Sequence, residues 1–253
     1  MIVDSLWHFP VKGLTGACRD TVHLEAGKHF PDDRLYAIGN GHPKHDELTP
    51  GLWQKKALFL QQMKTEALAA LDCRFDGTCL DIHHHGKLVV SADMDSADGR
   101  HDIDAFFAEF VGDQTPGAPR LMRIAEGSFA DTPYGEHALL TLGGTASVAR
   151  FAEATDTTPD MRRFRLNIML QTDTPFEEAS LIGKRVKLGA AVVKVVDPVG
   201  RCAAIDVDPE TALRGPHYLP MMEKAFGHTD LGIFAEVVES GPVSIGDRLE
   251  QLD

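Results

Sequence analysis

Short apolar runs bounded by Gly, Pro or Asp occur along most of the chain, and they are the feature that most limits its fold. Runs of this kind with turn residues between them are typical of β-strands. We expect strands at residues 2–9, 21–24, 34–39, 80–83, 87–91, 121–125, 138–142, 164–170, 185–188, 190–196 and 233–239. Because helical segments do not alternate regularly with these strands, a doubly wound βαβ fold is not expected. The pattern predicts an α+β fold that is mainly β, built as a barrel or a sandwich.

Helical periodicity is restricted to a few segments. Apolar residues recur at intervals of three or four over residues 52–71, which predicts a helix with one polar side. That polar side would carry Lys55, Lys56, Gln61 and Glu66. A second helix is expected over residues 100–111, where Asp98 can cap the start and Gly112 follows a Phe-rich apolar stripe. Shorter helices are expected at residues 145–154 and 218–226.

The length and composition of the chain predict a globular protein of one large domain or two modest ones. It has 253 residues, of which 43% are hydrophobic and 25% are charged, so it can bury a core. Residues 113–119 (DQTPGAP) have the composition of a linker. We therefore predict an N-terminal domain at residues 1–115 and a second domain at residues 116–253.

Charge and hydropathy disfavour several classes of partner. The chain carries 25 basic and 38 acidic side chains, a net charge of −13, which disfavours nucleic acid as a partner. The chain does not open with a basic segment followed by an apolar one, and no apolar run is long enough to cross a membrane. These observations predict a cytoplasmic protein without a membrane partner. The four cysteines lack CxxC spacing, so free thiols are expected rather than disulfides or a zinc cluster.

Cys202 has the setting of a reactive thiol. It follows Arg201 in a turn at the end of an apolar run, and a neighbouring guanidinium group favours the thiolate, which is the nucleophilic and metal-binding form. The alternative is a buried and inert cysteine. Cys73 and Cys79 lie near apolar positions expected in the core, and Cys18 precedes an arginine in a predicted loop. Cys202 is therefore the strongest candidate for cysteine chemistry.

An arginine cluster lies around the start of a predicted strand. The segment 161–167 (MRRFRLN) contains Arg162, Arg163, Arg165 and Asn167. Guanidinium groups bind phosphate or carboxylate through two parallel hydrogen bonds, and an Asn side chain can donate to and accept from a heterocycle. These residues predict an anion pocket. The alternative is a set of surface arginines that pair with Asp156 and Asp160.

Histidine clusters and nucleotide motifs offer weaker signals. His83, His84 and His85 are adjacent, and adjacent residues of a strand point to opposite faces, so a solvated strand end is expected rather than a metal site. His42 and His45 lie in a segment typical of a polar loop. The sequence contains no HExxH, Walker, GxSxG or GxGxxG motif and no iron–sulfur spacing. A redox enzyme with this sequence would need electrons from a separate protein.

Several motifs occur in the order found in the MOSC family, which is named for the C-terminal domain of molybdenum-cofactor sulfurase. Residues 9–14 (FPVKGL) resemble the opening motif of the family, and Asp33 and Arg34 resemble its Asp-Arg pair. Residues 163–168 (RFRLNI) resemble its Arg-Phe-Arg-Pro-Asn-Ile motif. The cysteine signature and the C-terminal segments are matched by residues 201–211 (RCAAIDVDPET), 232–238 (GIFAEVV) and 241–247 (GPVSIGD). The chain resembles the branch of the family that carries an additional N-terminal β-barrel domain.

The resemblance implies a MOSC β-barrel, an N-terminal β-barrel-like domain, and a cysteine that ligates molybdenum in a bound pterin cofactor or carries sulfur as a persulfide. The cofactor-binding relatives are the mitochondrial amidoxime-reducing component and its bacterial counterparts. In them, Lys, Arg and Asn side chains of these motifs hold the pterin and its phosphate. By this resemblance Cys202 is the metal ligand and the catalytic thiolate. The implied cofactor-binding residues are Lys12, Arg34, Asp131, Ser147, Arg165, Asn167 and Arg201.

Three functions are consistent with the resemblance. The first is a molybdenum-cofactor-binding oxidoreductase that reduces small N- or S-oxygenated substrates with electrons from a separate electron-transfer protein. The second is a sulfur carrier, in which Cys202 takes a persulfide from a cysteine desulfurase and passes it to an acceptor. The third is a binding module without chemistry. Molybdenum ion binding and pyridoxal phosphate binding also belong to what the resemblance implies. The chain departs from the family pattern at Gly13, where serine is usual, and at Leu166, where proline is usual.

Overall fold

The computed structural model describes residues 1–47, 51–133 and 137–252, and most of its elements are β-strands. The strands are β1 (Ile2–His8), β2 (Val11–Lys12), β3 (Ala17–Arg19), β4 (Thr21–Leu24), β5 (Tyr36–Gly39), β6 (Leu71–Asp76), β7 (Cys79–His84), β8 (Lys87–Asp93), β9 (Arg120–Arg123), β10 (Leu140–Gly144), β11 (Ile168–Gln171), β12 (Arg185–Leu188), β13 (Ala191–Gly200), β14 (Asp230–Glu239), β15 (Gly241–Ser244) and β16 (Leu249–Gln251). The helices are α1 (Lys44–Glu47), α2 (Ala97–Val111), α3 (Thr145–Thr155) and α4 (Tyr218–Phe226). The 3₁₀ turns near the site are η1 (Lys56–Leu58), η2 (Glu66–Ala70), η4 (Met161–Arg163) and η6 (Ala203–Asp206). The predicted α+β, mainly β fold class is confirmed.

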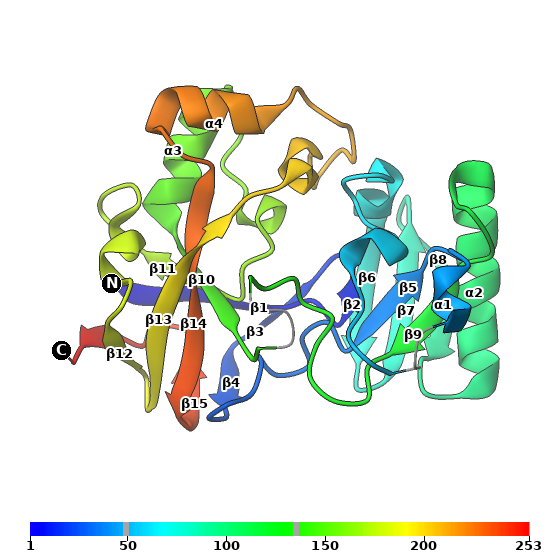
Figure 1. Ribbon diagram of the computed structural model, residues 1–253, viewed down its shortest axis with the longest axis horizontal. Helices are drawn as coiled ribbons and strands as arrows, with labels where there is room; N and C mark the ends of the chain where they lie inside the picture. Colours follow the sequence, from blue (N-terminus) through cyan, green and yellow to red (C-terminus); the bar gives the residue numbers. More distant parts are fainter. Residues whose placement is uncertain (48–50, 134–136, 253) are drawn as a thin grey trace.

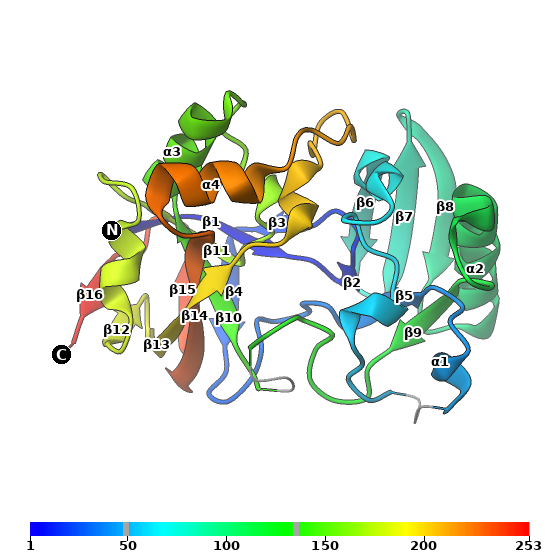
Figure 2. The same cartoon turned by 45° about the horizontal axis from the view of Figure 1, so that its top comes forward.

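An eight-stranded sheet, with the order β16-β12-β13-β14-β10-β11-β1-β3, dominates one side of the molecule (Figure 1). Its neighbouring strands are antiparallel except β10 and β11, which are parallel. The sheet curls, and an isolated bridge joins Ile2 of β1 to Arg248 beside β16. Helix α3 packs against β10, β11 and β14, and α4 packs against α3 (Figure 2). We call this sheet with α3, α4, η6 and the segment 207–217 between η6 and α4 the large lobe.

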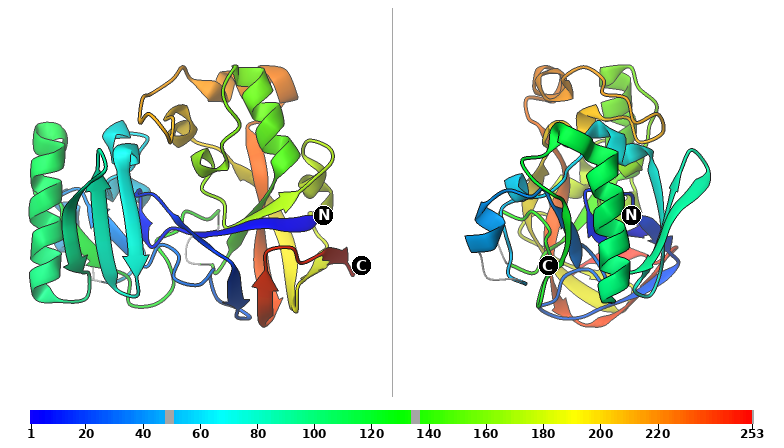
Figure 3. Two further views of the ribbon diagram at one scale, coloured as in Figure 1. Left: turned by 180° about the vertical axis from the view of Figure 1, so that it is seen from behind. Right: turned by 90° about the vertical axis from the view of Figure 1, so that its right-hand side faces the viewer.

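The small lobe holds two three-stranded sheets, β2-β5-β9 and β6-β7-β8, together with α2, η1 and η2 (Figures 1 and 3). Helix α2 packs against β8 and β9. Its Ile103 and Phe107 side chains are fully buried in a core that also contains Leu71, Leu80 and Ile82 of the β6-β7-β8 sheet. The small lobe therefore has a hydrophobic core of its own.

Helix α2 confirms the helix predicted at residues 100–111, but its N-terminal capping residue differs from the predicted one. Ser96 rather than Asp98 caps it, because the Ser96 hydroxyl accepts the Gly99 N–H at 2.9 Å. Gly112 ends the helix with a φ of 51°, a left-handed value that favours glycine. None of the helices in the described part of the chain is both long and apolar enough to span a membrane.

The prediction of a helix at residues 52–71 is wrong. The segment forms no α-helix and contains the short 3₁₀ turns η1 and η2, a turn at residues 62–64 and a single bridge residue, Phe59. Phe59 forms an isolated bridge with β5, and the Leu60 N–H donates to the Ile38 carbonyl at 2.8 Å. Leu58, Phe59 and Leu60 are buried in succession, which a helix with one apolar side does not produce. Pairing with β5 therefore replaces the helix.

The remaining predicted strands and the two shorter helices lie close to their predicted positions, with one partial error at residues 164–170. Strand β11 begins only at Ile168. The preceding residues form η4 and a turn in which Arg165 has a φ of 54°. A left-handed residue interrupts an extended strand, so the first part of the predicted strand is a loop.

The two lobes exchange segments of the chain. The large lobe includes β1 and β3, and β4 pairs with β15 from the end of the chain. Conversely, β9 lies beyond the predicted linker and pairs with β5 of the small lobe. The division of the chain at residues 1–115 and 116–253 stays a prediction.

Candidate functional site

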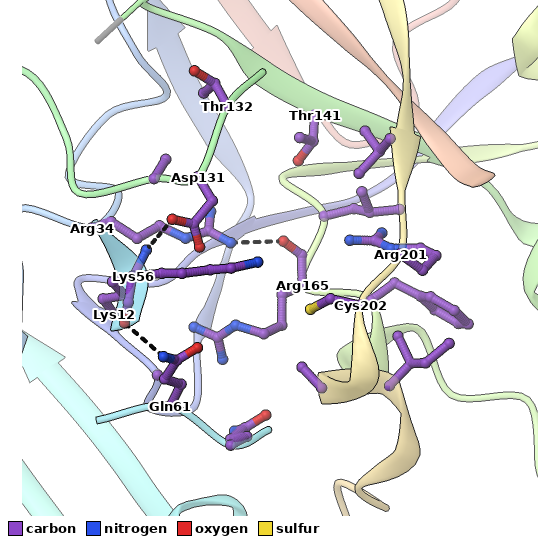
Figure 4. A pocket seen from close by; sticks show the side chains of 18 of the residues that line it. Lys12, Arg34, Lys56, Gln61, Asp131, Thr132, Thr141, Arg165, Arg201 and Cys202 are labelled. Carbon is purple, nitrogen blue, oxygen red and sulfur yellow. Dashed lines mark hydrogen bonds and ion pairs between the residues drawn. The ribbon is translucent and has the colours of Figure 1, made fainter. Parts of the chain in front are cut away.

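A cavity of about 210 Å³ lies where the two lobes meet (Figure 4). The predicted site residues that line it are Lys12, Arg34, Asp131, Arg165, Asn167, Arg201 and Cys202. They come from β2, from the loop before β5, from the loop before β10, from the turn before β11, and from the segment after β13. The fold thus brings motifs that are distant in sequence to one cavity.

Lys12 is buried at the end of β2 and faces Asp131 (Figure 4). Its ammonium group donates to the Phe129 carbonyl at 2.7 Å and forms an ion pair with Asp131 at 2.9 Å. Burial lowers the pKa of Lys12, and the Asp131 charge opposes this shift. An ammonium group has more N–H donors than these two contacts use. Lys12 therefore keeps a donor for a ligand.

Arg34 and Arg165 both have a left-handed backbone, with φ values of 53° and 54°. Such a conformation is unfavourable for a residue with a Cβ atom and persists where its surroundings hold it. One Arg34 N–H donates to the Arg165 carbonyl at 2.9 Å, and another binds the Asp33 carboxylate. Both guanidinium groups lie near the Phe9 ring, 4.5 and 4.4 Å from its centroid. These contacts hold two positive charges side by side at the cavity.

Cys202 lies between Arg165 and Arg201 in the cavity (Figure 4). It follows β13 and immediately precedes η6, and its carbonyl accepts the Ile205 N–H at 3.1 Å. The side chain is partly buried and its thiol is free. The turn therefore holds the thiol at the cavity wall while leaving it accessible.

Among the described residues, the hydrogen-bond partners of the Arg165 and Arg201 guanidinium groups are carbonyl groups only. Arg165 donates to the Leu14 carbonyl, and Arg201 donates to the Leu231 carbonyl at 3.1 Å. The Arg201 Nε atom is buried without a hydrogen-bond partner in the described part of the chain. Burial lowers the pKa of both guanidinium groups, and the Arg34 charge acts in the same direction. The residues present therefore fit a phosphorylated ligand that carries a thiolate-binding metal.

The arginines of segment 161–167 have three different environments. Arg162 is exposed and pairs with Asp160 at 2.7 Å, as the surface alternative predicts. Arg163 is buried, and its guanidinium group binds the segment that follows Cys202. Arg165 faces the cavity beside the thiol. The anion-pocket interpretation therefore applies to one arginine of the three.

Asn167 lines the cavity, but the fold already uses its side-chain amide. The Oδ1 atom accepts the Thr141 N–H at 3.1 Å and the Thr141 hydroxyl at 2.9 Å. The Nδ2 group donates to the Trp7 carbonyl at 3.3 Å. Asn167 thus joins β1, β10 and the start of β11, and its direct role in cofactor binding stays a prediction.

The structure does not place Ser147 at the cavity. Its side chain is fully buried in α3, and the hydroxyl donates to the Glu178 carboxylate, whose oxygens lie 2.8 and 2.9 Å away. The same hydroxyl accepts the Phe176 N–H at 2.8 Å. Glu178 is 1% exposed, so Ser147 satisfies a buried carboxylate.

We expect the Ser147→Ala substitution to lower the free energy of unfolding by about 1–3 kcal/mol, because it removes a donor from a buried carboxylate. Urea denaturation followed by circular dichroism measures this change. Ser180→Ala is the control, since Ser180 is exposed and its loss should leave stability unchanged. Unchanged stability in Ser147→Ala would contradict this structural role.

Three polar residues of the small lobe line the cavity without having been predicted to do so: Lys56, Gln61 and Gln62. The predicted helix placed Lys56 and Gln61 on its solvent side, and that helix does not form. A signal was present, because the apolar residues 57–60 are bounded by polar residues at both ends. Such a pattern also describes a short buried segment whose ends are exposed.

Both departures from the MOSC family pattern have local explanations in packing. Gly13 has a φ of 86°, and a Cβ atom there would lie 2.7 Å from the Leu60 carbonyl oxygen, so a serine would be strained. Leu166 is buried beside Gly143 and Gly232, where added Cβ atoms would lie 2.3 and 3.0 Å from its side chain. The two glycines make room for the leucine.

The other cysteines and the histidines lie away from the cavity lining. All four cysteines are free thiols, as predicted. Cys73 is buried, and burial raises its pKa to about 12. Burial and the Asp20 charge raise the pKa of Cys18. His45 is hydrogen-bonded to the Leu58 carbonyl at 2.6 Å. Among the described residues, no group of three or more His, Cys, Asp or Glu side chains is arranged to hold a metal ion.

Comparison with known proteins identifies relatives that match part of the chain. The molybdenum cofactor sulfurase of Drosophila mojavensis is 35% identical over 103 residues, which is 40% of this chain and 12% of that protein. The molybdenum cofactor sulfurase of Danio rerio is 26% identical over 176 residues, which is 61% of this chain and 21% of that protein. The chain therefore spans a small part of the length of both relatives.

Two solved structures are similar to this chain at low identity. The YuaD protein of Bacillus subtilis is 11% identical with a TM-score of 0.46, covering 98% of this chain and 93% of that one. YiiM of Geobacillus stearothermophilus is 20% identical with a TM-score of 0.35, covering 45% of this chain and 54% of that one. Residues 131–250 match the family model described as MOSC domain. This match identifies a MOSC domain at residues 131–250 of the chain.

Proposed function

We propose that the cavity binds the molybdenum cofactor, with Cys202 as the thiolate ligand of the metal, and that the protein reduces small N- or S-oxygenated substrates. One observation carries the proposal: a free thiol faces the same cavity as two guanidinium groups that lack carboxylate partners among the described residues. A thiolate is a soft ligand for a transition metal, and guanidinium groups suit phosphate. The MOSC domain and the relatives named molybdenum cofactor sulfurase support the same cofactor.

The residues of the chain would bind and orient the cofactor. Arg165 and Arg201 would hold its phosphate, and Lys12 and Arg34 would add positive charge to the same cavity. Cys202 would bind the metal as a thiolate. When bound, the cofactor supplies the redox chemistry. Because the sequence has neither iron–sulfur spacing nor a dinucleotide motif, the electrons would come from a separate electron-transfer protein.

A sulfur carrier is the second candidate, and the accessibility of the Cys202 thiol favours it. The Cys202 thiolate would attack the terminal sulfur of a persulfide on a cysteine desulfurase. The new S–S bond forms as the thiolate of the desulfurase leaves. The relatives named molybdenum cofactor sulfurase also support a sulfur-transfer role. The binding module without chemistry and the binding of pyridoxal phosphate stay predictions.

Elemental and mass analysis separates these functions. We expect protein purified from a host that makes the cofactor to contain stoichiometric molybdenum and pterin, and Cys202→Ala to lose the molybdenum. Cys79→Ala is the control, because Cys79 is exposed and lies outside the cavity lining. Metal-free protein that gains the mass of one sulfur atom on Cys202 would favour the carrier. Folded protein that contains no molybdenum and no added sulfur atom on Cys202 would favour the binding module without chemistry.

A further inference from the structure

A wall of the cavity comes from the small lobe and faces the thiol of the large lobe. It consists of Lys56, Gln61 and Gln62, and we call it the polar wall. The Gln61 amide donates to the Lys56 carbonyl at 2.6 Å, which fixes the turn between them. The Lys56 side chain extends across the cavity, with its ammonium group toward the side that carries Arg201 and Cys202 (Figure 4).

The Lys56 ammonium group differs from the other positive groups of the cavity. Lys12 is held by Asp131 and Arg34 by Asp33, and both side chains are largely buried. Lys56 is exposed, and within the described part of the chain its ammonium group has no hydrogen-bond or ion-pair partner. A resident cofactor suits cations that the fold holds in place. An exchanging ligand suits a cation that solvent can reach, because that ligand has to enter and leave.

The position of the polar wall is set from the large lobe by Arg214. Its guanidinium group donates to the carbonyls of Gln62 and Met63, both at 3.1 Å, and pairs with Glu66 at 3.1 Å. Beside this contact, Val207 and Ala212 of the large lobe pack against Ala69 of η2. The segment that follows Cys202 therefore holds the wall opposite the thiol.

We propose that the polar wall is a substrate subsite that selects small compounds with a carboxylate or sulfonate group. The anionic group contacts the Lys56 ammonium group, and the two Gln side chains supply additional hydrogen bonds. The rest of the compound then lies toward Cys202. This inference rests on the proposed function in one respect, namely that the chemistry takes place at Cys202.

Alkylation of Cys202 by two reagents of different charge tests the subsite. The thiolate displaces iodide from either reagent, so that an S–C bond forms and a C–I bond breaks. Iodoacetate is an anion and iodoacetamide is neutral, so the ratio of their rates reports the charge near the thiol. Peptide mapping by mass spectrometry gives this ratio for Cys202, with Cys18 and Cys79 as internal references.

We expect the Lys56→Gln variant to lower the iodoacetate-to-iodoacetamide ratio at Cys202 by about two- to five-fold, the effect of removing one solvent-exposed charge. Lys56→Arg should restore the ratio. Lys55→Gln is the matched control, because Lys55 is an exposed neighbour outside the cavity lining, and it should leave the ratio unchanged. Both Gln variants should leave the rates at Cys18 and Cys79 unchanged.

Three results would overturn the subsite. The first is an unchanged ratio in Lys56→Gln. The second is a Cys202 that neither reagent alkylates in the metal-free protein. The third is a loss of molybdenum from Lys56→Gln, which would assign Lys56 to the resident cofactor. The ratio of the two alkylation rates can be measured on protein that carries neither a metal nor a persulfide. Failure of the proposed function would instead be detected by the elemental and mass analysis of the wild-type protein.

Discussion

The Arg165→Met variant is expected to retain about ten- to a hundred-fold less molybdenum cofactor than the wild-type protein, since a hydrogen bond to a charged group contributes about 1.5–3 kcal/mol. Methionine keeps much of the length of the side chain and removes every donor. Molybdenum content is measured by elemental analysis and pterin content by fluorescence after oxidation. Wild-type molybdenum content in Arg165→Met would remove this arginine from the site.

The same substitution should stabilise the cofactor-free protein by about 1–2 kcal/mol, because replacing a buried charge by an apolar side chain is often favourable. Burial and the Arg34 charge lower the pKa of Arg165 to about 9. The unfolded chain therefore binds this proton more tightly than the native protein, which costs stability below that pKa. The difference in free energy of unfolding between variant and wild type should accordingly be present at pH 7, where urea denaturation measures it.

The Arg163→Met variant is expected to lose about 3 kcal/mol of unfolding free energy, because buried carbonyls lose their donor. Arg163 donates to the Ile205 carbonyl at 2.8 Å and to the Val207 carbonyl at 2.9 Å, and it pairs with Asp208 at 2.9 Å. These contacts hold η6, which directly follows Cys202. Urea denaturation measures the loss, and the alkylation rate of Cys202 by iodoacetamide should rise as η6 loosens.

Arg162→Met is the matched control for both arginine variants. Arg162 is the neighbour of Arg163 in sequence, and its pairs with Asp160 and Glu210 are exposed. Exposed ion pairs contribute about 0–1 kcal/mol, so this variant should keep its stability and its molybdenum. A loss in Arg162→Met as large as that in Arg163→Met would contradict the role assigned to Arg163.

Strand positions were predictable where the apolar pattern is local. Val186 and Leu188 of β12 are buried and alternate with exposed Arg185 and Lys187, so the period of two is visible in the sequence. Helix α4 likewise shows its boundaries in the sequence, with Gly227 directly after its last residue. The prediction for residues 52–71 was wrong because the spacing of their apolar residues also fits a helix. Their pairing with β5 is a tertiary contact that no local pattern reveals.

The site was predictable only as a set of motifs. The reactive setting of Cys202 and the anion-binding chemistry of Arg165 follow from residue types and neighbours. Their meeting in one cavity depends on long-range pairing, such as that of β1 with β11. Arg162 and Arg163 are neighbours in the turn η4, and this turn exposes the Arg162 side chain to solvent and buries that of Arg163. The position of Lys56 in the cavity lining was not predicted, because the sequence pattern predicted a helix at residues 52–71 that does not form.

The pairing of β1 with β11 has a consequence for how the protein is made. Strand β1 can pair early with the nearby strand β3. Ile2 lies opposite Gln171 and Leu6 opposite Ile168, so the edge of β1 that faces β11 has no partner until residues 168–171 have been synthesised. Strand β12 likewise gains its partner β16 only when residues 249–251 have been synthesised. The nascent chain must therefore keep unpaired strand edges from associating with other chains until these partner strands have been synthesised. The eight-stranded sheet can be completed only after the residues of β16 have been synthesised.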